Sequence, residues 1–171
     1  MSINKNNFTY RTASLSDKEQ LKSLGIISYG QFYNVLTPEN SKILNDNLNN
    51  DDKLTELINL STCYICEDQD VIVGMAHIIP NGNPSDIFKT EWSYIRMVGV
   101  NPKYQGQGIA KSLTQMCIDK AKQTKEKTIA LHTSEFMCAA RHIYESLGFK
   151  ILQEIDPRLG KKYWLYTLDL S

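Results

Sequence analysis

The segment at residues 105–111 has residue types and a spacing that could bind an anion. It reads Gln-Gly-Gln-Gly-Ile-Ala-Lys, and the small residues Gly106, Gly108 and Ala110 lie where a helix is expected to begin. Small side chains leave backbone N–H groups uncovered, and the N-terminus of a helix carries a partial positive charge. The segment therefore predicts a site for a phosphate or pyrophosphate group.

Two common phosphate-binding motifs do not describe this segment. A Walker loop requires G-x-x-x-x-G-K-[ST], which is absent from the chain. A dinucleotide fingerprint requires G-x-G-x-x-G, but Lys111 stands at the third glycine position. The acidic residue of that fingerprint is also missing, because His132 ends the next expected strand. A lone G-x-G could equally be an ordinary turn, so these residues alone leave the ligand open.

The strand before this segment contains a glycine. Residues 97–100 read Met-Val-Gly-Val, and Gly99 lies inside the apolar run. A glycine within a strand weakens it and often marks a bulge or a close approach of another backbone. We therefore expect the strand to be disturbed near Gly99.

Two motifs in this order resemble the bacterial type of the GNAT superfamily of N-acetyltransferases. Residues 105–110 are similar to its acetyl-CoA signature Q/R-x-x-G-x-G/A, and residues 98–102 resemble the V-x-P that precedes it. Residues 140–149 resemble the second motif, A-x-x-x-Y-x-x-x-G-F. Met137 departs from the family, which often has Asn there to hydrogen-bond the coenzyme. The resemblance is sharp over residues 91–150.

The resemblance implies a site for acetyl-CoA in a gap where one central strand splays away from its neighbour. Backbone groups near Val98 and Val100 would pair with the pantetheine arm, and an N–H near Val98 could stabilise the oxyanion of the reaction. The implied cofactor-binding residues are Val98, Gly99, Val100, Gln105, Gly106, Gly108, Ile109, Ala110, Lys111 and Tyr144.

Tyr144 resembles the family's general acid, which protonates the departing CoA thiolate. A tyrosine of ordinary pKa, about 10, donates to a thiolate of pKa about 8.5 only at some cost, so hydrogen bonding could be its main role. The alternative is that Tyr144 is a core aromatic residue on the apolar face of its helix.

The general base has two candidates. An alkylammonium of pKa about 10.4 must lose its proton near pH 7, at a cost of about 4–5 kcal/mol. Glu91 begins the strand that leads to residues 97–100, a region where family members often carry a base. His132 has a suitable intrinsic pKa. The alternatives are a solvated strand end for Glu91 and a buried structural imidazole for His132.

Other residues of chemical interest favour structural roles. Cys63 and Cys66 form a C-x-x-C, but on a strand they would point to opposite faces, which argues against zinc or redox chemistry. We expect all the cysteines, which include Cys117 and Cys138, to be small buried thiols. His77 and His142 read as structural or exposed. Trp92 and Tyr94 could line an acceptor pocket or pack in the core.

The pattern of apolar residues predicts an α+β fold with an α/β-type core. Helices are expected after residue 16, within residues 37–60 (one or two short ones), and at residues 106–122 and 134–147. Strands are expected at residues 8–13, 63–67, 71–79, 92–100, 128–132, 149–155 and 162–170, the last two antiparallel. The resemblance implies a mixed, mostly antiparallel sheet flanked by helices, with a V-shaped splay between the two central strands.

Composition excludes several classes of protein. The 171 residues, with 42% hydrophobic residues, suit one domain over residues 1–171 rather than a disordered chain. The 19 basic and 19 acidic residues give a net charge of +0, which disfavours a nucleic-acid module. No apolar run reaches the length of a membrane helix, and residues 1–7 show no signal peptide, so we expect a cytoplasmic chain with reduced cysteines.

Two hypotheses about function follow. The resemblance implies an enzyme that transfers the acetyl group of acetyl-CoA to a primary amine, either a small molecule or a peptide N-terminus. The alternative is a non-catalytic acyl-CoA-binding sensor or regulatory protein of the same fold. The acceptor and the oligomeric state stay open, although homodimers are common in the family.

Overall fold

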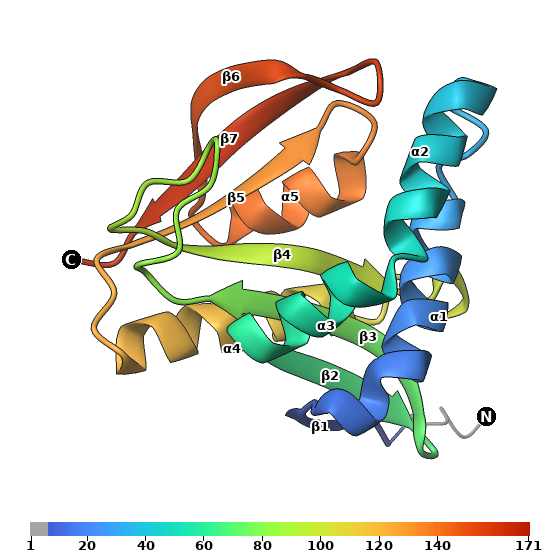
Figure 1. Cartoon of the computed structure of the whole chain (residues 1–171). Coiled ribbons are helices and arrows are strands. Elements are labelled where there is room, and N and C mark those ends of the chain that lie inside the picture. Colours follow the sequence, from blue (N-terminus) through green and yellow to red (C-terminus); the bar gives the residue numbers. More distant parts are fainter. Residues whose placement is uncertain (1–6) are drawn as a thin grey trace.

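The computed structural model describes residues 7–171, and every strand in this range joins one seven-stranded sheet (Figure 1). The strand order is β1-β2-β3-β4-β5-β7-β6. The strands are β1 (Thr9–Thr12), β2 (Thr62–Asp68), β3 (Val71–Ile79), β4 (Ser93–Val100), β5 (Thr128–Ser134), β6 (Lys150–Arg158) and β7 (Lys161–Asp169). All seven expected strands are therefore present.

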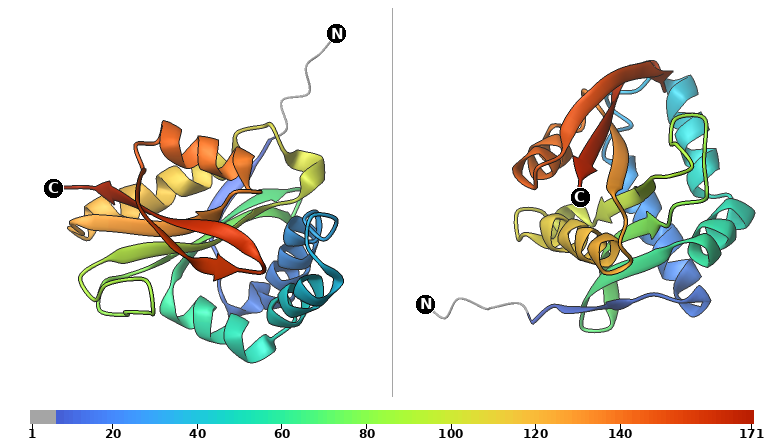
Figure 2. Two further views of the ribbon diagram at one scale, coloured as in Figure 1. Left: turned by 90° about the horizontal axis from the view of Figure 1, so that it is seen from above. Right: turned by 90° about the vertical axis from the view of Figure 1, so that its left-hand side faces the viewer.

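In the described part of the chain, five helices flank the sheet. One face carries α1 (Lys18–Gly30), α2 (Pro38–Leu48) and α3 (Asp51–Leu60), and the other carries α4 (Ile109–Gln123) and α5 (Cys138–Ser146) (Figure 2). Two short 3₁₀ turns, η1 (Leu15–Asp17) and η2 (Pro102–Tyr104), precede α1 and α4. The expected α+β architecture, with helices on both sides of a mixed sheet, is confirmed.

Neighbouring strands are antiparallel except at the centre of the sheet. There β4 and β5 run parallel, joined by α4 as a strand-helix-strand unit. Their ladder contains only Ser93 with Ile129 and Tyr94 with Ala130. Beyond Tyr94 the two strands separate, while β5 pairs with β7 along its whole length. The sheet thus has the expected splay between its central strands, and it opens toward the C-terminal end of β4.

Local sequence signals explain where two of the helices begin. The Thr37 side chain accepts a hydrogen bond from the Asn40 N–H at 3.1 Å, and Pro38 occupies the first helical position, where it needs no N–H partner. The Asn50 side chain caps α3 in the same way, through the Lys53 N–H at 3.0 Å. Residues 37–60 therefore form two helices.

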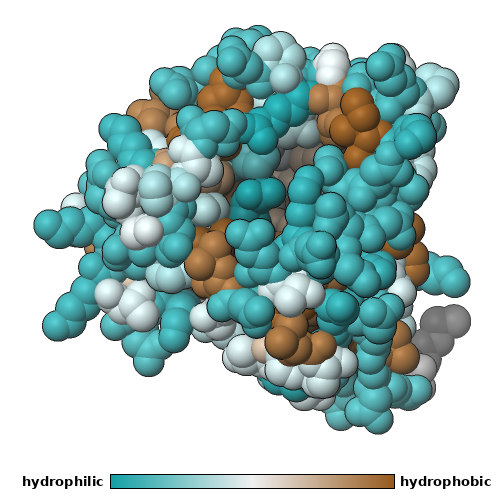
Figure 3. Space-filling model, viewed as in Figure 1, coloured by the Kyte–Doolittle hydropathy of each residue, from teal (hydrophilic) through white to brown (hydrophobic). Residues whose placement is uncertain are grey.

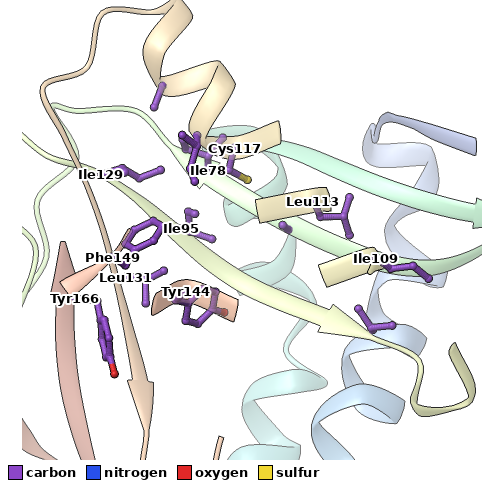
Figure 4. Packing of buried hydrophobic residues seen from close by; sticks show 14 of the residues in the cluster. Ile78, Ile95, Ile109, Leu113, Cys117, Ile129, Leu131, Tyr144, Phe149 and Tyr166 are labelled. Atoms are coloured by element: carbon purple, nitrogen blue, oxygen red, sulfur yellow. The ribbon is translucent and has the colours of Figure 1, made fainter. Parts of the chain in front are cut away.

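The largest hydrophobic cluster lies between the sheet and the pair α4 and α5. It includes Ile109, Leu113 and Cys117 from α4 and Tyr144 from α5, packed on strand residues such as Ile95 (Figure 4). Burying one such aliphatic side chain contributes about 1.5–3 kcal/mol, so this cluster fixes α4 and α5 on the sheet.

Two predicted helix boundaries are wrong. Helix α4 begins at Ile109 rather than at residue 106, because Gly106 and Gly108 have φ of 78° and 79°, outside the right-handed helical region. Helix α5 begins at Cys138 rather than at residue 134, because the ladder with β7 continues to Ser134. Phe136, which precedes the helix, packs edge-on to Phe32 with ring centroids 5.0 Å apart.

The prediction about the cysteines is right for three of them. Cys63, Cys66 and Cys117 are buried and free, and the two on β2 belong to different hydrophobic clusters, as expected for opposite faces. Cys138 is exposed, because it is the first residue of α5 and lies at the solvent end of that helix.

In residues 7–171 no helix combines the length and apolar character that crossing a bilayer requires. The expectation about a signal peptide concerns residues 1–7, of which residues 1–6 lie outside the described residues.

Candidate active site

The glycine segment forms an open loop in front of α4. Gly106 and Gly108 both have positive φ, and a Cβ added to either would meet no atom within 4 Å. Gly108 is the N-cap of α4, so the N–H groups of the next residues have no partner within the helix. The loop therefore has uncovered backbone donors, a helix N-terminus and free space, as a pyrophosphate group would require.

Contacts on both sides hold this loop in place. The Gln105 side-chain amide donates to Gln31 Oε1 at 3.0 Å, which links the loop to the end of α1. On the other side, Ile109 packs on β3 so closely that a Cβ at Gly74 would lie 2.6 Å from Ile109 Cγ2. Gly74 thus lets the start of α4 sit directly on the sheet.

The disturbance in β4 lies two residues before the position expected from the sequence. The register with β3 shifts between Met75, opposite Gly99, and His77, opposite Arg96, and Met97 has φ of 54°. The bulge therefore centres on Met97 rather than Gly99. Gly99 provides the close approach instead, because a Cβ there would lie 3.0 Å from Ser28 Oγ of α1.

Two residues of α1 reach the backbone of β4 beside the bulge. The Tyr29 hydroxyl donates to the Val98 carbonyl at 3.2 Å, and Ser28 Oγ accepts from the Val100 N–H at 3.1 Å. Two backbone groups next to the expected pantetheine track therefore already have protein partners. Sequence reasoning missed both residues, because nothing in a local pattern links α1 to a strand about seventy positions later.

Tyr144 lies on α5 with its ring in the large core (Figure 4). Burial, with a smaller effect of Tyr29 and Cys117, raises the pKa of Tyr144 well above its usual value. Among residues 7–171 its hydroxyl has no hydrogen-bond partner. Tyr144 is thus both a core aromatic residue and a protonated hydroxyl available to a ligand.

His132 lies on β5 between two aromatic rings, with centroids 5.9 Å from Phe88 and 5.7 Å from Tyr163. Its Nδ1 atom is buried and has no hydrogen-bond partner in the described part of the chain. Burial, followed by the positive charges of Arg96 and Arg158, lowers the pKa of His132 to about 3. The imidazole is therefore neutral at pH 7 and only a weak base.

Glu91 is not brought to the bulge. It is exposed two residues before β4, in a loop whose residues 84–91 surround a shallow pocket of about 520 Å³. From Ser93 to Met97 the strand covers about 13 Å, and Glu91 lies beyond that end. The structure thus groups Tyr144 and the glycine segment around the splay but leaves Glu91 outside it.

The remaining candidates from the sequence are structural or exposed. His77 is buried, with Nδ1 3.1 Å from Ser61 Oγ, and His142 is exposed. Trp92 and Tyr94 are buried in a cluster with Phe88, which stacks on Tyr94 at a centroid distance of 4.1 Å. In the described residues no group of three or more His, Cys, Asp and Glu could hold a metal ion.

The splay opens into a hollow on the face of the sheet that carries α1, α2 and α3. Figure 3 shows the surface hollowed between α2 and the part of the sheet formed by β5 and β7. The glycine loop lies at the N-terminus of α4, which covers the opposite face. Two molecules could thus meet at the bulge in β4 from opposite sides of the sheet.

Comparison with known proteins agrees with this geometry. The model of the acetyltransferase (GNAT) family matches residues 29–149. The N-acetyltransferase YjgM of Escherichia coli K12 is 33% identical over 98 residues, which cover 57% of this chain and 54% of that protein. Human N-acetyltransferase 8B is 28% identical over 95 residues, 53% of this chain and 41% of that protein. The chain thus spans about half the length of the curated relatives it matches.

A solved structure shares the fold over almost the whole chain. The PaiA N-acetyltransferase of Thermoplasma acidophilum, in complex with coenzyme A, superposes with a TM-score of 0.77 at 14% identity. The match covers 95% of this chain and 99% of that one. At this identity the likeness shows the fold.

Proposed function

Since the chain belongs to the acetyltransferase (GNAT) family, we propose that it transfers the acetyl group of acetyl-CoA to a primary amine. The observation that carries this proposal is the pairing of an open glycine loop with the splay between β4 and β5. We further propose that residues 1–171 act as one acetyltransferase domain in the cytoplasm. All the described strands belong to one sheet, which supports a single domain.

The residues present suit acetyl-CoA. The N–H groups of Gly106, Gly108, Ile109, Ala110 and Lys111, with Gln105 beside them, would hold its pyrophosphate. The backbone of β4 around Val98, Gly99 and Val100 would hold the pantetheine arm. Because Ser28 and Tyr29 already bond two of these groups, the arm would use the others or displace these contacts. The bound coenzyme would supply an activated acyl carbon as a thioester.

The chain's own residues would then assist the transfer. Transfer would join the amine nitrogen to the acyl carbon and break the carbon–sulfur bond, so that CoA leaves as a thiolate and the amine's proton passes to a base or to solvent. An N–H near Val98 would stabilise the oxyanion. With its raised pKa, Tyr144 keeps its proton and would stabilise the thiolate mainly by a hydrogen bond.

The two candidate bases would play different parts in removing the amine's proton. With a pKa of about 3, His132 would accept a hydrogen bond from the incoming amine rather than hold its proton at pH 7. Glu91 would need a rearrangement of its loop to reach the bulge. Removal of the proton by solvent would make the rate rise with pH toward the amine's own pKa, which ordinarily is about 10.4.

Thermal unfolding with and without acetyl-CoA tests the cofactor site. A ligand at 100 times its dissociation constant adds about 2.7 kcal/mol, so the midpoint should rise by roughly 5–10 °C. No shift at millimolar acetyl-CoA would overturn the proposal.

Turnover separates the enzyme from a non-catalytic acyl-CoA sensor of the same fold. Tyr144→Phe should keep the thermal shift but release CoA thiol more slowly with an amine acceptor. A wild-type protein that binds acetyl-CoA but acetylates no amine would favour the sensor. Turnover unchanged by Tyr144→Phe would remove Tyr144 from the acid role.

A further inference from the structure

Arg96 differs from the other arginines in having no ion-pair or hydrogen-bond partner among the described residues. Three of the four arginines have an acidic partner: Arg11 pairs with Asp17 at 2.8 Å, Arg141 with Glu145 at 3.9 Å, and Arg158 with Asp86 at 2.9 Å. Arg96 has neither an ion pair nor a hydrogen bond from its side chain within residues 7–171, and it is exposed. An exposed guanidinium keeps five N–H donors in a fixed planar fork, which suits a carboxylate.

The position of Arg96 makes this unpaired charge relevant to the reaction. It immediately precedes Met97 at the bulge, on the stretch of β4 that has lost its pairing with β5. Its partner across the ladder with β3 is His77, and paired residues of neighbouring strands point to the same face. His77 contacts Ser61 at the end of α3, so Arg96 lies on the face with α1, α2 and α3.

The groups around Arg96 confirm that its charge reaches this face. In four side chains burial has the largest effect on the pKa, and the charge of Arg96, which lowers the pKa, has the second largest. These side chains are Tyr29 on α1, His77 on β3, Tyr94 on β4 and His132 on β5. The two histidines are neutral at pH 7, because their pKa values are about 4 and about 3. The acidic group that acts on His132, Asp86, is already bound to Arg158. Arg96 is thus a cation among neutral rings.

Arg96 is poorly placed to serve the coenzyme's phosphates. Val100 lies four positions further along β4, at most about 13 Å away because the bulge at Met97 shortens the strand, and the glycine loop lies beyond Val100. The loop also begins α4, on the opposite face of the sheet. The acceptor, in contrast, would approach the bulge through the hollow on the face of Arg96 (Figure 3).

We propose that Arg96 binds a carboxylate of the acceptor, so that the preferred acceptors are small amines that carry a carboxylate, such as free amino acids. This inference rests on the proposed acetyl transfer. A carboxylate paired with Arg96 would hold an amine a few bonds away beside the bulge, where the thioester would lie. Cationic acceptors such as polyamines would be repelled by the same charge.

Acetyl transfer to matched acceptors tests the inference. Glycine, β-alanine and L-aspartate are compared with their carboxamides and with spermidine, by thiol release from acetyl-CoA. We expect the carboxylates to have a kcat/KM at least about 10-fold higher than the carboxamides, which is the scale of one charge-assisted hydrogen bond. L-Aspartate that is amidated only at its α-carboxyl keeps its side-chain carboxylate, as the N-terminal aspartate of a peptide does. Comparing its kcat/KM with that of free L-aspartate tells whether the enzyme prefers a free amino acid or the acidic N-terminal residue of a peptide.

Variants of Arg96 assign the preference to this residue. Arg96→Gln should raise KM for the carboxylate acceptors roughly 10- to 100-fold, leave the carboxamides unchanged, and keep the thermal shift with acetyl-CoA. Arg96→Lys should restore part of the affinity, since it keeps the charge but not the planar fork. Lys150→Gln removes an exposed positive charge on β6 and should change neither class of acceptor.

The thermal shift separates failure of the inference from failure of the proposed function. If wild type shows no shift with acetyl-CoA, or shows the shift but acetylates no amine at all, the proposed function fails. If wild type shows the shift and acetylates amines, any of three results overturns the inference. These are a preference for carboxamides or spermidine, no acetylation of any carboxylate in the panel, and an Arg96→Gln effect equal on both classes. A weaker shift with acetyl-CoA in Arg96→Gln would assign Arg96 to the coenzyme and also overturn it.

Discussion

At the scale of single residues, the glycine loop depends on backbone conformations that other residues adopt only under strain. Gly106 and Gly108 have positive φ, and both face open space. An added methyl group would therefore meet no protein atom, and its consequences would be backbone strain and the loss of space for a ligand. Backbone strain and loss of ligand space can be measured separately, because Gly82 provides a control outside this loop. It also has a positive φ, 88°, and an added Cβ would meet no atom within 4 Å.

Gly108→Ala should cost about 1–2 kcal/mol of stability, because an L-residue is disfavoured in the left-handed region. Gly82→Ala, in the loop before β4, should cost a similar amount. Only Gly108→Ala should weaken acetyl-CoA binding, by about 10-fold or more, as measured by calorimetric titration. Equal affinities in the two variants would contradict the assignment of this loop to the pyrophosphate.

At the scale of elements, the site depends on how closely α4 and α1 approach the central strands. Helix α4 contacts β3 at Gly74, where Ile109 leaves no room for a side chain. Helix α1 contacts β4 through Ser28 and Tyr29, on either side of Gly99. The positions of the loop and the bulge are thus set by helix packing on both faces of the sheet.

Gly74→Ala should lower the free energy of unfolding by about 1–3 kcal/mol, because its methyl group overlaps Ile109. Since Ile109 begins α4, the same variant should also weaken acetyl-CoA binding. Gly25→Ala in α1 is the matched control. Its methyl group would have neighbours at 3.6 Å, an ordinary contact, and helix propensity should make it neutral or stabilising by about 1 kcal/mol. Urea unfolding of both variants checks the pair, and equal losses would contradict the packing argument.

At the scale of the whole molecule, two histidines link stability to pH: His77 is buried and His132 is half-buried. Burial lowers the pKa of His77 to about 4 and that of His132 to about 3, from an ordinary value near 6.5. The unfolded chain therefore binds more protons than the folded chain below about pH 6.5. The stabilisation is complete above that pH and is lost as the pH falls toward the folded pKa values.

Urea unfolding at pH 7, 6 and 5 should show this loss, up to about 1.4 kcal/mol per pH unit for each histidine below pH 6.5. His77→Gln should reduce the slope by one histidine's share, whatever its effect at pH 7. An unchanged slope in His77→Gln would contradict the lowered pKa.

The sequence by itself determined the order of the elements and marked residues 105–111 as a candidate phosphate-binding loop. Apolar periodicity located the strands and helices, and the spacing of Gly106, Gly108, Tyr144 and Gly148 was enough for the family resemblance. These features are local, because a few consecutive residues fix backbone conformation and which face is apolar. The wrong predictions concern the starts of α4 and α5. The helix propensity of a segment does not tell where a neighbouring strand, such as β5 in its ladder with β7, ends.

Only the tertiary structure decided which side chains share the site. The sequence could not bring Tyr29 to Val98 or leave Arg96 unpaired, because such relations depend on the packing of segments far apart in the chain. It also could not separate Glu91 from the splay or show that His132 has a pKa of about 3, since burial is a property of the assembled sheet. Local conformation is encoded by neighbouring residues, whereas charge, solvation and proximity at a site arise from contacts that exist only after folding.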